Sequence, residues 1–419
     1  PELNAEIRKL SGMANNLNQQ GFSIGEYMNF SGAAQSMMRG GGGTGQMTIG
    51  SNEGIPINFD GRPGSNGIMT SWAGGVNVNR TIAQKTDVNA SYFYNYLDHD
   101  LNRDLERENF LPGGNYDFQS LSNQESNNNN HRLNLRIDHS FDDDNSLLFT
   151  ANTTFNNTDT YQESNSSTHS FTGDLQNSSS QVSTVFGEGN NINTSLLYRR
   201  RLSEPGRTLT AGADINYNSN DQEGSLEALN IYNHQDGAEE RIMQDNIQGS
   251  TGRLMGLNFS YTEHIGNRRY LEANYRITQN YNEVNQQVYD IENGERSLNE
   301  LLTNIYENSY LYQRGGMNLR LNRDMFNLTL GTSLQYTQLS GEILTHGVEI
   351  ESTYFNILPV VRFNYDFSSM KRLSANFETS VQEPSLLQLQ PLVDNRDPLN
   401  LYEGNPDLRP SYRNRLMIR

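Results

Sequence analysis

Strict alternation of apolar and polar residues is the dominant pattern of this chain. In "HRLNLRIDHS" (131–140), Leu133, Leu135 and Ile137 alternate with arginine, asparagine and aspartate. A two-residue period is typical of a β-strand, because successive side chains of a strand point to opposite faces. The pattern therefore predicts strands with one apolar face and one wet face.

The same alternation recurs along most of the sequence. Examples are "RTLTAGADINY" (207–217) and "LEANYRIT" (271–278), and roughly twelve such stretches of about 8–12 residues lie between Gly74 and Gln382, the length of tilted strands that cross a membrane. Strands of soluble proteins are shorter, at about 5–6 residues. No run approaches the ~18 apolar residues of a membrane helix. We therefore predict an all-β protein, a transmembrane antiparallel up-and-down β-barrel.

The connections between these stretches alternate in length. Short ones include "SFDDDNS" (140–146) and "HIGNRR" (264–269), and the long polar ones are 98–130, 157–190, 218–250, 282–308 and 338–352. Outer-membrane barrels have short periplasmic turns and long extracellular loops, so the alternation favours that class. A secreted adhesin built from β-sandwiches is an alternative, but a sandwich has no reason to sort its connections by length.

In such a barrel the apolar side chains face lipid and the polar ones line the lumen. The charged residues of the polar set are the candidate functional side chains. They are Arg132, Arg136, Asp138, Arg199, Asp214, Glu272, Arg276, Arg320, Arg362 and Glu378. Each could contact a solute or a plug, but a polar lumen is generic, so pairing with neighbours is the favoured interpretation for any single residue.

Aromatic residues crowd the predicted strand ends. These residues are Tyr92, Tyr94, Tyr96, Tyr310, Tyr312, Tyr354 and Phe355. Aromatic girdles lie at the two membrane–water interfaces of barrels, so we expect these side chains there.

The first 72 residues differ from the rest. "ELNAEIRKLSGMANNLNQQ" (2–20) has apolar residues at helical spacing, which predicts a short amphipathic helix. "GFSIGEYMNFSG" (21–32) and "TGQMTIG" (44–50) predict two further strands. We therefore divide the chain into an N-terminal segment, 1–72, and a barrel region, 73–419, which we expect to be incomplete at its C-terminal end.

Composition agrees with this assignment. Of 419 residues, 34% are hydrophobic. This fraction is low for a soluble protein with several hydrophobic cores, but it suits strands with one apolar face. The formal charge of −18 argues against nucleic acid as a partner, because phosphate binding needs clustered Lys and Arg. The absence of cysteine excludes disulfides and thiolate metal sites.

No stretch predicts catalysis, a metal or a cofactor. "RGGGGTG" (39–45) lacks the Lys-Ser/Thr ending of a phosphate-binding loop, and a flexible loop is the better interpretation. "FDDDN" (141–145) could offer carboxylates to Ca²⁺, but a turn explains it equally well. The seven histidines lack the spacing of a zinc site, and no GxSxG occurs. We therefore expect no enzymatic activity.

The C-terminal stretch carries a family resemblance. "NFETSVQEPSLLQLQPLVDNRDPLNLYEGNPDLRPSYRNRL" (376–416) resembles a segment in the barrels of TonB-dependent receptors, in which a Pro-Ser is followed by a GNP-x-L-x-P turn. The matching residues are Pro384, Ser385, Gly404, Asn405, Pro406 and Pro410. Including "GGVNVNRTIAQKTDVNASYFYNYLDHD" and "NFLPGGNYDF", the resemblance covers roughly residues 66–419.

This resemblance implies a location in the outer membrane of a Gram-negative cell and a barrel of 22 strands, of which about 13–15 are visible here. It implies import of a bulky solute such as an oligosaccharide, peptide or metal chelate, with outer-membrane lipids, TonB and a surface lipoprotein as partners. No plug or TonB box is recognisable. The alternative is therefore a non-transporting barrel that acts as a scaffold with other subunits of an outer-membrane complex.

Overall fold

A computed structural model describes most of the chain. The described residues are 4–8, 47–49, 55–57, 67–110, 115–202, 204, 206–233, 237–345, 347–368, 371–384, 386–389, 393–394, 402–403, 405 and 407–419. The predicted loop "RGGGGTG" and the predicted strand 21–32 lie outside them. Within the described part, no helix has the length and apolarity to cross a bilayer.

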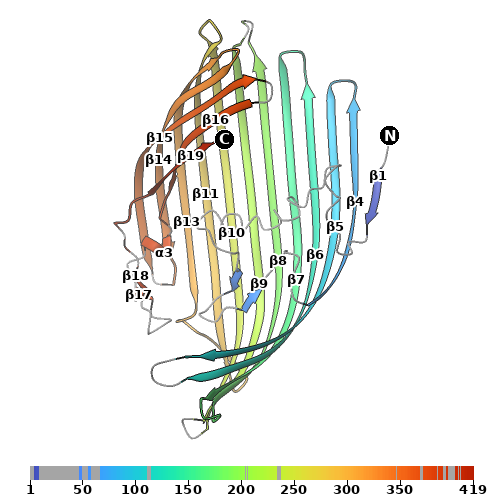
Figure 1. Ribbon diagram of the computed structural model, residues 1–419, viewed down its shortest axis with the longest axis vertical. Coiled ribbons are helices and arrows are strands. Elements are labelled where there is room, and N and C mark those ends of the chain that lie inside the picture. The colour runs from blue at the N-terminus through green and yellow to red at the C-terminus, as the bar shows by residue number, and fades with distance from the viewer. Residues whose placement is uncertain are drawn as a thin grey trace.

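The fold is one large antiparallel up-and-down sheet (Figure 1), which confirms the predicted fold class. Its hydrogen-bonded order is β1-β4-β5-β6-β7-β8-β9-β10-β11-β13-β14-β15-β16-β19, and β12 pairs with β11. The bounds are β1 (Asn4–Arg8), β4 (Ile68–Ile82), β5 (Thr86–Asn109), β6 (Tyr116–Ser140), β7 (Asn145–Ser170), β8 (Leu175–Arg201), β9 (Thr208–Tyr232), β10 (Ala238–His264), β11 (Arg269–Glu292), β12 (Glu295–Leu298), β13 (Asn304–Asn322), β14 (Phe326–Ile343), β15 (Val348–Ser368), β16 (Lys371–Gln382) and β19 (Ser411–Ile418).

In the described part of the chain, two short strand pairs and one helical turn lie outside this sheet. They are the pair β2 (Met47–Ile49) and β3 (Ile55–Ile57), the pair β17 (Val393–Asp394) and β18 (Tyr402–Glu403), and the single helical turn α3 (Leu386–Leu389). β2 falls within the strand predicted at 44–50.

The N-terminal prediction was partly wrong. Residues Asn4–Arg8, which the apolar spacing assigned to a helix, form β1 and pair antiparallel with β4. Five residues make barely more than one helical turn, whereas pairing with an open sheet edge satisfies their backbone groups at once. β4 begins at Ile68, a few residues before the boundary drawn at residue 73.

The long polar connections are built differently from the irregular loops that we expected. The strands β5 to β11 are 24 to 27 residues long, so the polar stretches 98–130, 157–190 and 218–250 continue the strands on both sides of short connections. At ~3.4 Å per residue these strands span roughly 80–90 Å, about three times the thickness of the hydrocarbon core. The hairpins therefore project far beyond any bilayer, at the end away from the short turns (Figure 1).

The register assigns every side chain to one of two faces. Residues paired across an antiparallel sheet share a face, and Leu135 pairs with Ala90 and Ala151, whereas Arg136 pairs with Asn89 and Thr150. We call the face of Leu135 the outer face and the face of Arg136 the inner face. Tracing the pairs from β5 to β15 keeps the two sets apart across the whole sheet.

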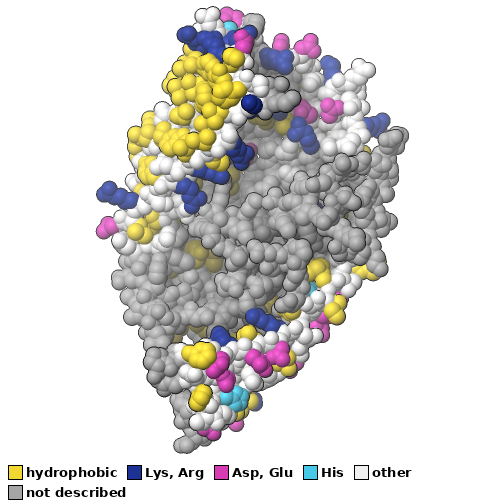
Figure 2. All heavy atoms as spheres, in the orientation of Figure 1, with side chains coloured by type: hydrophobic (Ala, Val, Ile, Leu, Met, Phe, Trp, Pro, Cys, Tyr) yellow, Lys and Arg dark blue, Asp and Glu magenta, His cyan; other side chains and the backbone are white. Residues whose placement is uncertain are grey.

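The outer face is apolar in a belt near the short turns. Figure 2 shows hydrophobic side chains gathered at that end, over β15, β16 and β19. On β10 the outer-face residues between Arg253 and Glu263 are Met255, Leu257, Phe259 and Tyr261, all exposed. These ten residue steps cover ~33 Å along a strand, or about 25 Å at a tilt of ~40°, which matches the apolar band of an outer-membrane barrel.

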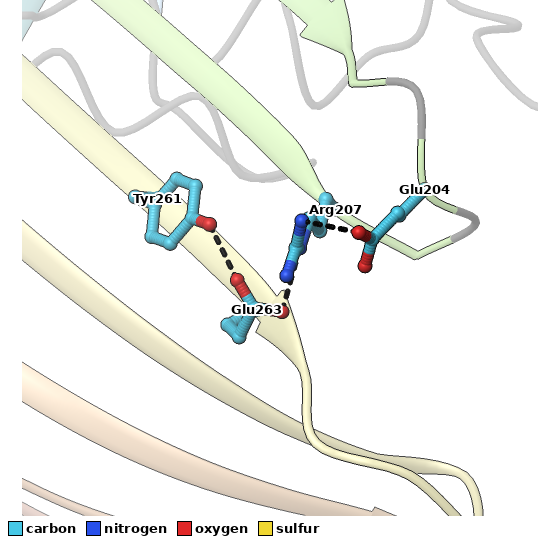
Figure 3. Close-up of polar contacts among 4 residues, drawn as sticks. All are labelled: Glu204, Arg207, Tyr261 and Glu263. Carbon is cyan, nitrogen blue, oxygen red and sulfur yellow. Dashed lines mark hydrogen bonds and ion pairs between the residues drawn. The ribbon is translucent and has the colours of Figure 1, made fainter.

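Charged groups close this belt at the short-turn end (Figure 3). Arg207 Nε donates to Glu263 Oε1 at 2.7 Å and Arg207 Nη1 lies 2.9 Å from Glu204 Oε1. The hydroxyl of Tyr261 donates to the other Glu263 oxygen at 2.5 Å. An aromatic ring with a polar tip that meets charged groups is the usual composition of a membrane–water interface.

At the far end of the belt the outer face becomes acidic. Glu283, Glu307, Glu342 and Glu349 form one cross-strand row on β11, β13, β14 and β15. Like charges directly opposite one another are destabilising and need water around them. The row therefore marks the level at which the outer face leaves the hydrocarbon.

The prediction of aromatic girdles was right for part of the set only. Tyr92, Tyr94 and Tyr96 share the outer face with Leu133, and Phe355 is 62% exposed there. Tyr310 and Tyr312 are on the inner face, as is Tyr354, which pairs with Thr337. The position of each aromatic residue within its strand decides this outcome, because consecutive residues of a strand point to opposite faces.

The acidic turn "FDDDN" is organised by its own backbone. Asp142 Oδ1 accepts hydrogen bonds from the backbone N–H groups of Asp144 and Asn145 at 2.9 and 2.7 Å and from the Asn145 side chain at 2.7 Å. This is an aspartate-capped turn, in which the carboxylate satisfies local donors.

The same contacts predict a pH response of this turn. The side-chain hydrogen bond from Asn145, followed by the backbone N–H of Asp144, lowers the pKa of Asp142 below its ordinary 3.8. A carboxyl with a lowered pKa in the folded state stabilises the turn above its unfolded pKa, and this contribution is lost as pH falls through the folded value. We expect Asn145→Ala to raise the pKa of Asp142 in an NMR titration; an unchanged value would contradict this assignment.

Candidate functional site: the inner face of the sheet

All ten charged candidates lie on the inner face. Arg132, Arg136, Asp138 and Arg199 come from β6 and β8, whereas Asp214, Glu272, Arg276, Arg320, Arg362 and Glu378 come from β9, β11, β13, β15 and β16. Their register partners, such as Phe93 for Arg132 and Asn376 for Arg362, carry the assignment from strand to strand. The structure thus gathers residues that are up to 246 positions apart (132 to 378) on one continuous surface.

Three ion pairs form within this set. Arg276 Nη2 lies 3.2 Å from Asp214 Oδ2, Arg320 Nη2 lies 3.3 Å from Glu272 Oε2, and Arg136 Nη2 lies 3.1 Å from Asp138 Oδ2. The arginines are about half exposed, so each pair contributes at most about 1 kcal/mol to stability. Arg276 also donates to Thr278 Oγ1, and Asn318 donates to Glu272.

One of these ion pairs reaches across a whole strand at a glycine. Asp214 on β9 and Arg276 on β11 are separated by β10, where Gly256 pairs with both Asp214 and Thr278. A Cβ at Gly256 would lie 3.6 Å from Arg276 Nη2 and 3.7 Å from Asp214 Cβ. The arginine therefore crosses the strand close above the backbone of Gly256, within van der Waals contact of where a Cβ would lie.

The space around this ion pair is a shallow pocket of about 430 Å³. Its inner-face lining includes Ser195, Asp214, Asn258, Asn274 and Arg276. Asn258 donates to Asp214 Oδ2 at 3.2 Å, so the carboxylate has two donors on one side. The pocket offers hydrogen-bond donors and acceptors with no net charge from its ion pair.

The family-motif residues are only partly described. Pro384 accepts a hydrogen bond at its carbonyl from Tyr310 OH at 3.1 Å. The backbone N–H of Asn405 donates to the Gln388 carbonyl at 2.7 Å, and its side-chain oxygen accepts from Asp407 N. Pro410 directly precedes β19. Ser385, Gly404 and Pro406 lie outside the described residues.

The sequence did not predict one inner-face cluster. Leu389 of α3 is fully buried against Tyr310, Leu339, Ile343 and Ile350. The carboxylate of Glu383 accepts hydrogen bonds from Gln335 and Thr337 at 3.1 and 3.3 Å. The chain therefore turns to the inner face directly after β16. The available signal was the apolar residues on both faces of β14 and β15, which depart from the wet-face pattern.

Burial raises the pKa of Glu383, with the hydrogen bonds from Thr337 and Gln335 partly opposing that shift. The folded state therefore favours the protonated Glu383 carboxyl. Ionisation of this carboxyl weakens the packing of Glu383 against the inner face. The expected consequence is that α3 is held more firmly as the pH falls through the raised pKa.

Another inner-face position is limited by backbone packing. A Cβ at Gly224 of β9 would lie 2.7 Å from the Thr184 carbonyl oxygen of β8. We expect Gly224→Ala to cost about 1–3 kcal/mol of unfolding free energy, because strand backbones must shift to admit it. Gly249→Ala is the control, since its Cβ would be close only to the movable Asp221 carboxylate at 3.1 Å and would lie 4.0 Å, an ordinary contact distance, from the Asn285 carbonyl oxygen. Chemical denaturation in detergent measures both variants, and equal stability would contradict the packing argument.

Comparison with known proteins agrees with this geometry. The model of an outer membrane protein beta-barrel family matches residues 200–418, just over half of the 419-residue chain. The chain belongs to this outer-membrane β-barrel family. A search of curated proteins finds no match. Among solved structures, the outer membrane protease OmpT from Escherichia coli aligns with 69% of this chain and 99% of its own, at 11% identity and a TM-score of 0.22.

Membership of the outer-membrane β-barrel family places the protein in the outer membrane. The outer face of the belt then contacts lipid, and the inner face lines the lumen. The short turns lie on the periplasmic side, and the long hairpins extend from the cell surface.

Proposed function

We propose that this outer-membrane β-barrel protein is a receptor that imports a bulky solute, as the resemblance to TonB-dependent receptors implies. The main support is the width of the sheet. Fourteen strands are hydrogen-bonded in one path. Eight strands already enclose an interior that side chains can fill, so a barrel that contains this sheet has a lumen wide enough for solute or a plug.

The inner face supplies the second line of support. Its charges and amides line a wet wall from the periplasmic turns into hairpins that reach far outside the bilayer. A long extracellular wall can capture solute before it enters the lumen. Residues 73–419 form the barrel region in this proposal. TonB on the periplasmic side and a lipoprotein on the surface are the proposed partners, and no enzymatic step is involved.

Uptake measurements test this proposal. Cells that produce the protein are offered labelled oligosaccharides, peptides and ferric chelates, with and without a protonophore or a functional TonB. We expect accumulation of one class that stops when energy coupling is removed, while surface binding persists. Entry that continues without energy would indicate passive diffusion and overturn the proposal.

A non-transporting scaffold is the second candidate, favoured by the cluster around Leu389. There an apolar part of the inner wall is covered by the chain itself rather than left for solute. A scaffold would co-purify with other outer-membrane subunits at fixed stoichiometry and show no energy-dependent uptake of any probe.

A further inference from the structure

The extracellular arm of β5 carries charges of opposite sign on its two faces. The register assigns the faces, since Asn102 pairs with Asn123 of the outer face and Arg103 pairs with Ser122 of the inner face. The outer-face residues of "DHDLNRDLEREN" (98–109) are Asp98, Asp100, Asn102, Asp104, Glu106 and Glu108. The inner-face residues are His99, Leu101, Arg103, Leu105, Arg107 and Asn109. Every carboxylate of this arm therefore points away from its two arginines.

Arg103 and Arg107, which we call the arginine pair, have neutral neighbours on the inner face. Across the strand boundary they lie opposite Ser122 and Phe118 of β6. On the other side, β4 pairs with β5 only as far as Asp100, so no strand of the described sheet flanks the arginine pair there. Their positive charges are therefore not compensated by a carboxylate of an adjoining strand.

The inner wall beyond β6 supplies no compensating charge either. On β6 to β9, no inner-face position of the described hairpins holds Asp, Glu, Lys or Arg within residues 116–130, 156–168, 177–189 and 220–232. The arginine pair thus gives this neutral wall a positive end. Figure 1 shows the extracellular ends of β5 to β8 bending across that end of the sheet, which turns their inner face toward the opening of the lumen.

Both arginines are accessible to a solute. Arg103 and Arg107 are exposed, and the guanidinium carbon of Arg107 lies 5.1 Å from the centre of the Phe118 ring. Contact with a ring orients a guanidinium through its face and does not use its N–H donors. The arginine pair therefore presents hydrogen-bond donors with positive charge to the opening.

The chemistry and the spacing of the arginine pair define what it can bind. A guanidinium matches a carboxylate with two parallel N–H···O bonds. Four residues of strand separate the two arginines, which is ~14 Å, with Leu105 between them. A small anion can reach one arginine only, whereas a bulky solute with two separated carboxylates can reach both.

We propose that the arginine pair selects the imported solute by charge and binds two carboxylates of one bulky anionic solute at the opening of the lumen. The carboxylates on the outer face of β5 repel the same solute, which confines its binding to the inner side. This inference rests on the proposed function, because it names the charge of the solute that the receptor imports and the residues that select it.

Binding measurements on the detergent-purified full chain test the proposal by isothermal titration calorimetry. The probes are matched pairs of equal size: a glutamate-rich peptide and its glutamine counterpart, an oligogalacturonate and its methyl ester, and a carboxylate-bearing and a neutral ferric chelate. In the class that the receptor binds, we expect the acidic member to bind at least about tenfold more tightly. Arg103→Gln and Arg107→Gln should each weaken that binding about three- to tenfold, and sodium chloride should weaken it in the native protein.

Asn102→Asp is the matched control. It lowers the net charge by the same amount as Arg103→Gln at the adjacent position, but on the outer face, so we expect a much smaller effect on binding. Equal effects of Asn102→Asp and Arg103→Gln, equal affinity for the two members of the bound pair, or no binding of any acidic member would overturn the inference. Energy-dependent uptake of a neutral solute would leave the receptor function standing without charge selection, whereas arginine-dependent binding of an acidic probe without uptake would do the reverse.

Discussion

Replacing Leu135 by arginine is expected to lower the free energy of unfolding of the assembled protein by about 2–4 kcal/mol. Leu135 lies on the outer face of β6 between Ala90 and Ala151, within the apolar belt. A guanidinium at this position must be taken out of water into hydrocarbon with no partner on the lipid side. Arg136→Leu, one residue along, should cost far less, because Arg136 lies in the wet lumen and its ion pair with Asp138 is exposed.

Reversible unfolding from lipid vesicles by guanidinium chloride measures this difference. The matched control is Asn123→Arg, which places the same charge on the outer face of the same strand but within the extracellular hairpin. We expect Asn123→Arg to change stability by less than about 0.5 kcal/mol, as surface substitutions usually do. If Leu135→Arg and Asn123→Arg were equally tolerated, the assignment of the belt to lipid would be wrong.

Leu389→Ala is the second substitution with a large expected effect. Leu389 is fully buried among Tyr310, Leu339, Ile343 and Ile350, so truncation leaves a cavity that rigid strands cannot close. Buried leucine-to-alanine changes cost about 2–5 kcal/mol. Because α3 is a single turn, held otherwise by Glu383, Pro384 and Gln388 contacts, we expect this cost to release α3 from the inner face rather than to unfold the sheet.

Hydrogen exchange by mass spectrometry distinguishes local release from general unfolding. We expect peptides that contain residues 383–389 to exchange faster in Leu389→Ala, while peptides of β10 and β11 keep their protection. Leu408→Ala is the control from the same C-terminal stretch, since Leu408 is 37% exposed whereas Leu389 is fully buried. Unchanged exchange at 383–389 would show that Leu389 does not anchor α3.

The two faces of the sheet illustrate how far periodicity alone reaches. The alternation of Leu133, Leu135 and Ile137 with charged residues fixed both the strand and the side on which each residue lies, because strand geometry links position to face directly. The positions of the short turns followed from the same pattern. All ten charged candidates accordingly lie on the inner face.

The long polar stretches show where this reasoning fails. "SNQESNNNN" has no apolar alternation, and Asn and Ser favour turns, so the sequence predicted loops. The structure continues β5 and β6 through it for the full length of both strands, with 24 consecutive register pairs. Backbone hydrogen bonds with the strands on both sides stabilise these residues as strands. A prediction from local propensity does not include that contribution.

The sequence by itself determined the class of this protein: strands with one apolar face over a stretch long enough to cross a membrane, short turns at one end, and a wet face that carries the charges. These features follow from residues at most a few positions apart, because a strand's faces are set by its two-residue period. Only the tertiary structure decided which distant groups meet. The ion pair between Arg276 and Asp214 across Gly256 and the inward burial of Leu389 against Tyr310 both depend on the register between strands. Periodicity determines the face on which a residue lies, but it does not determine how far one strand is shifted along its neighbour.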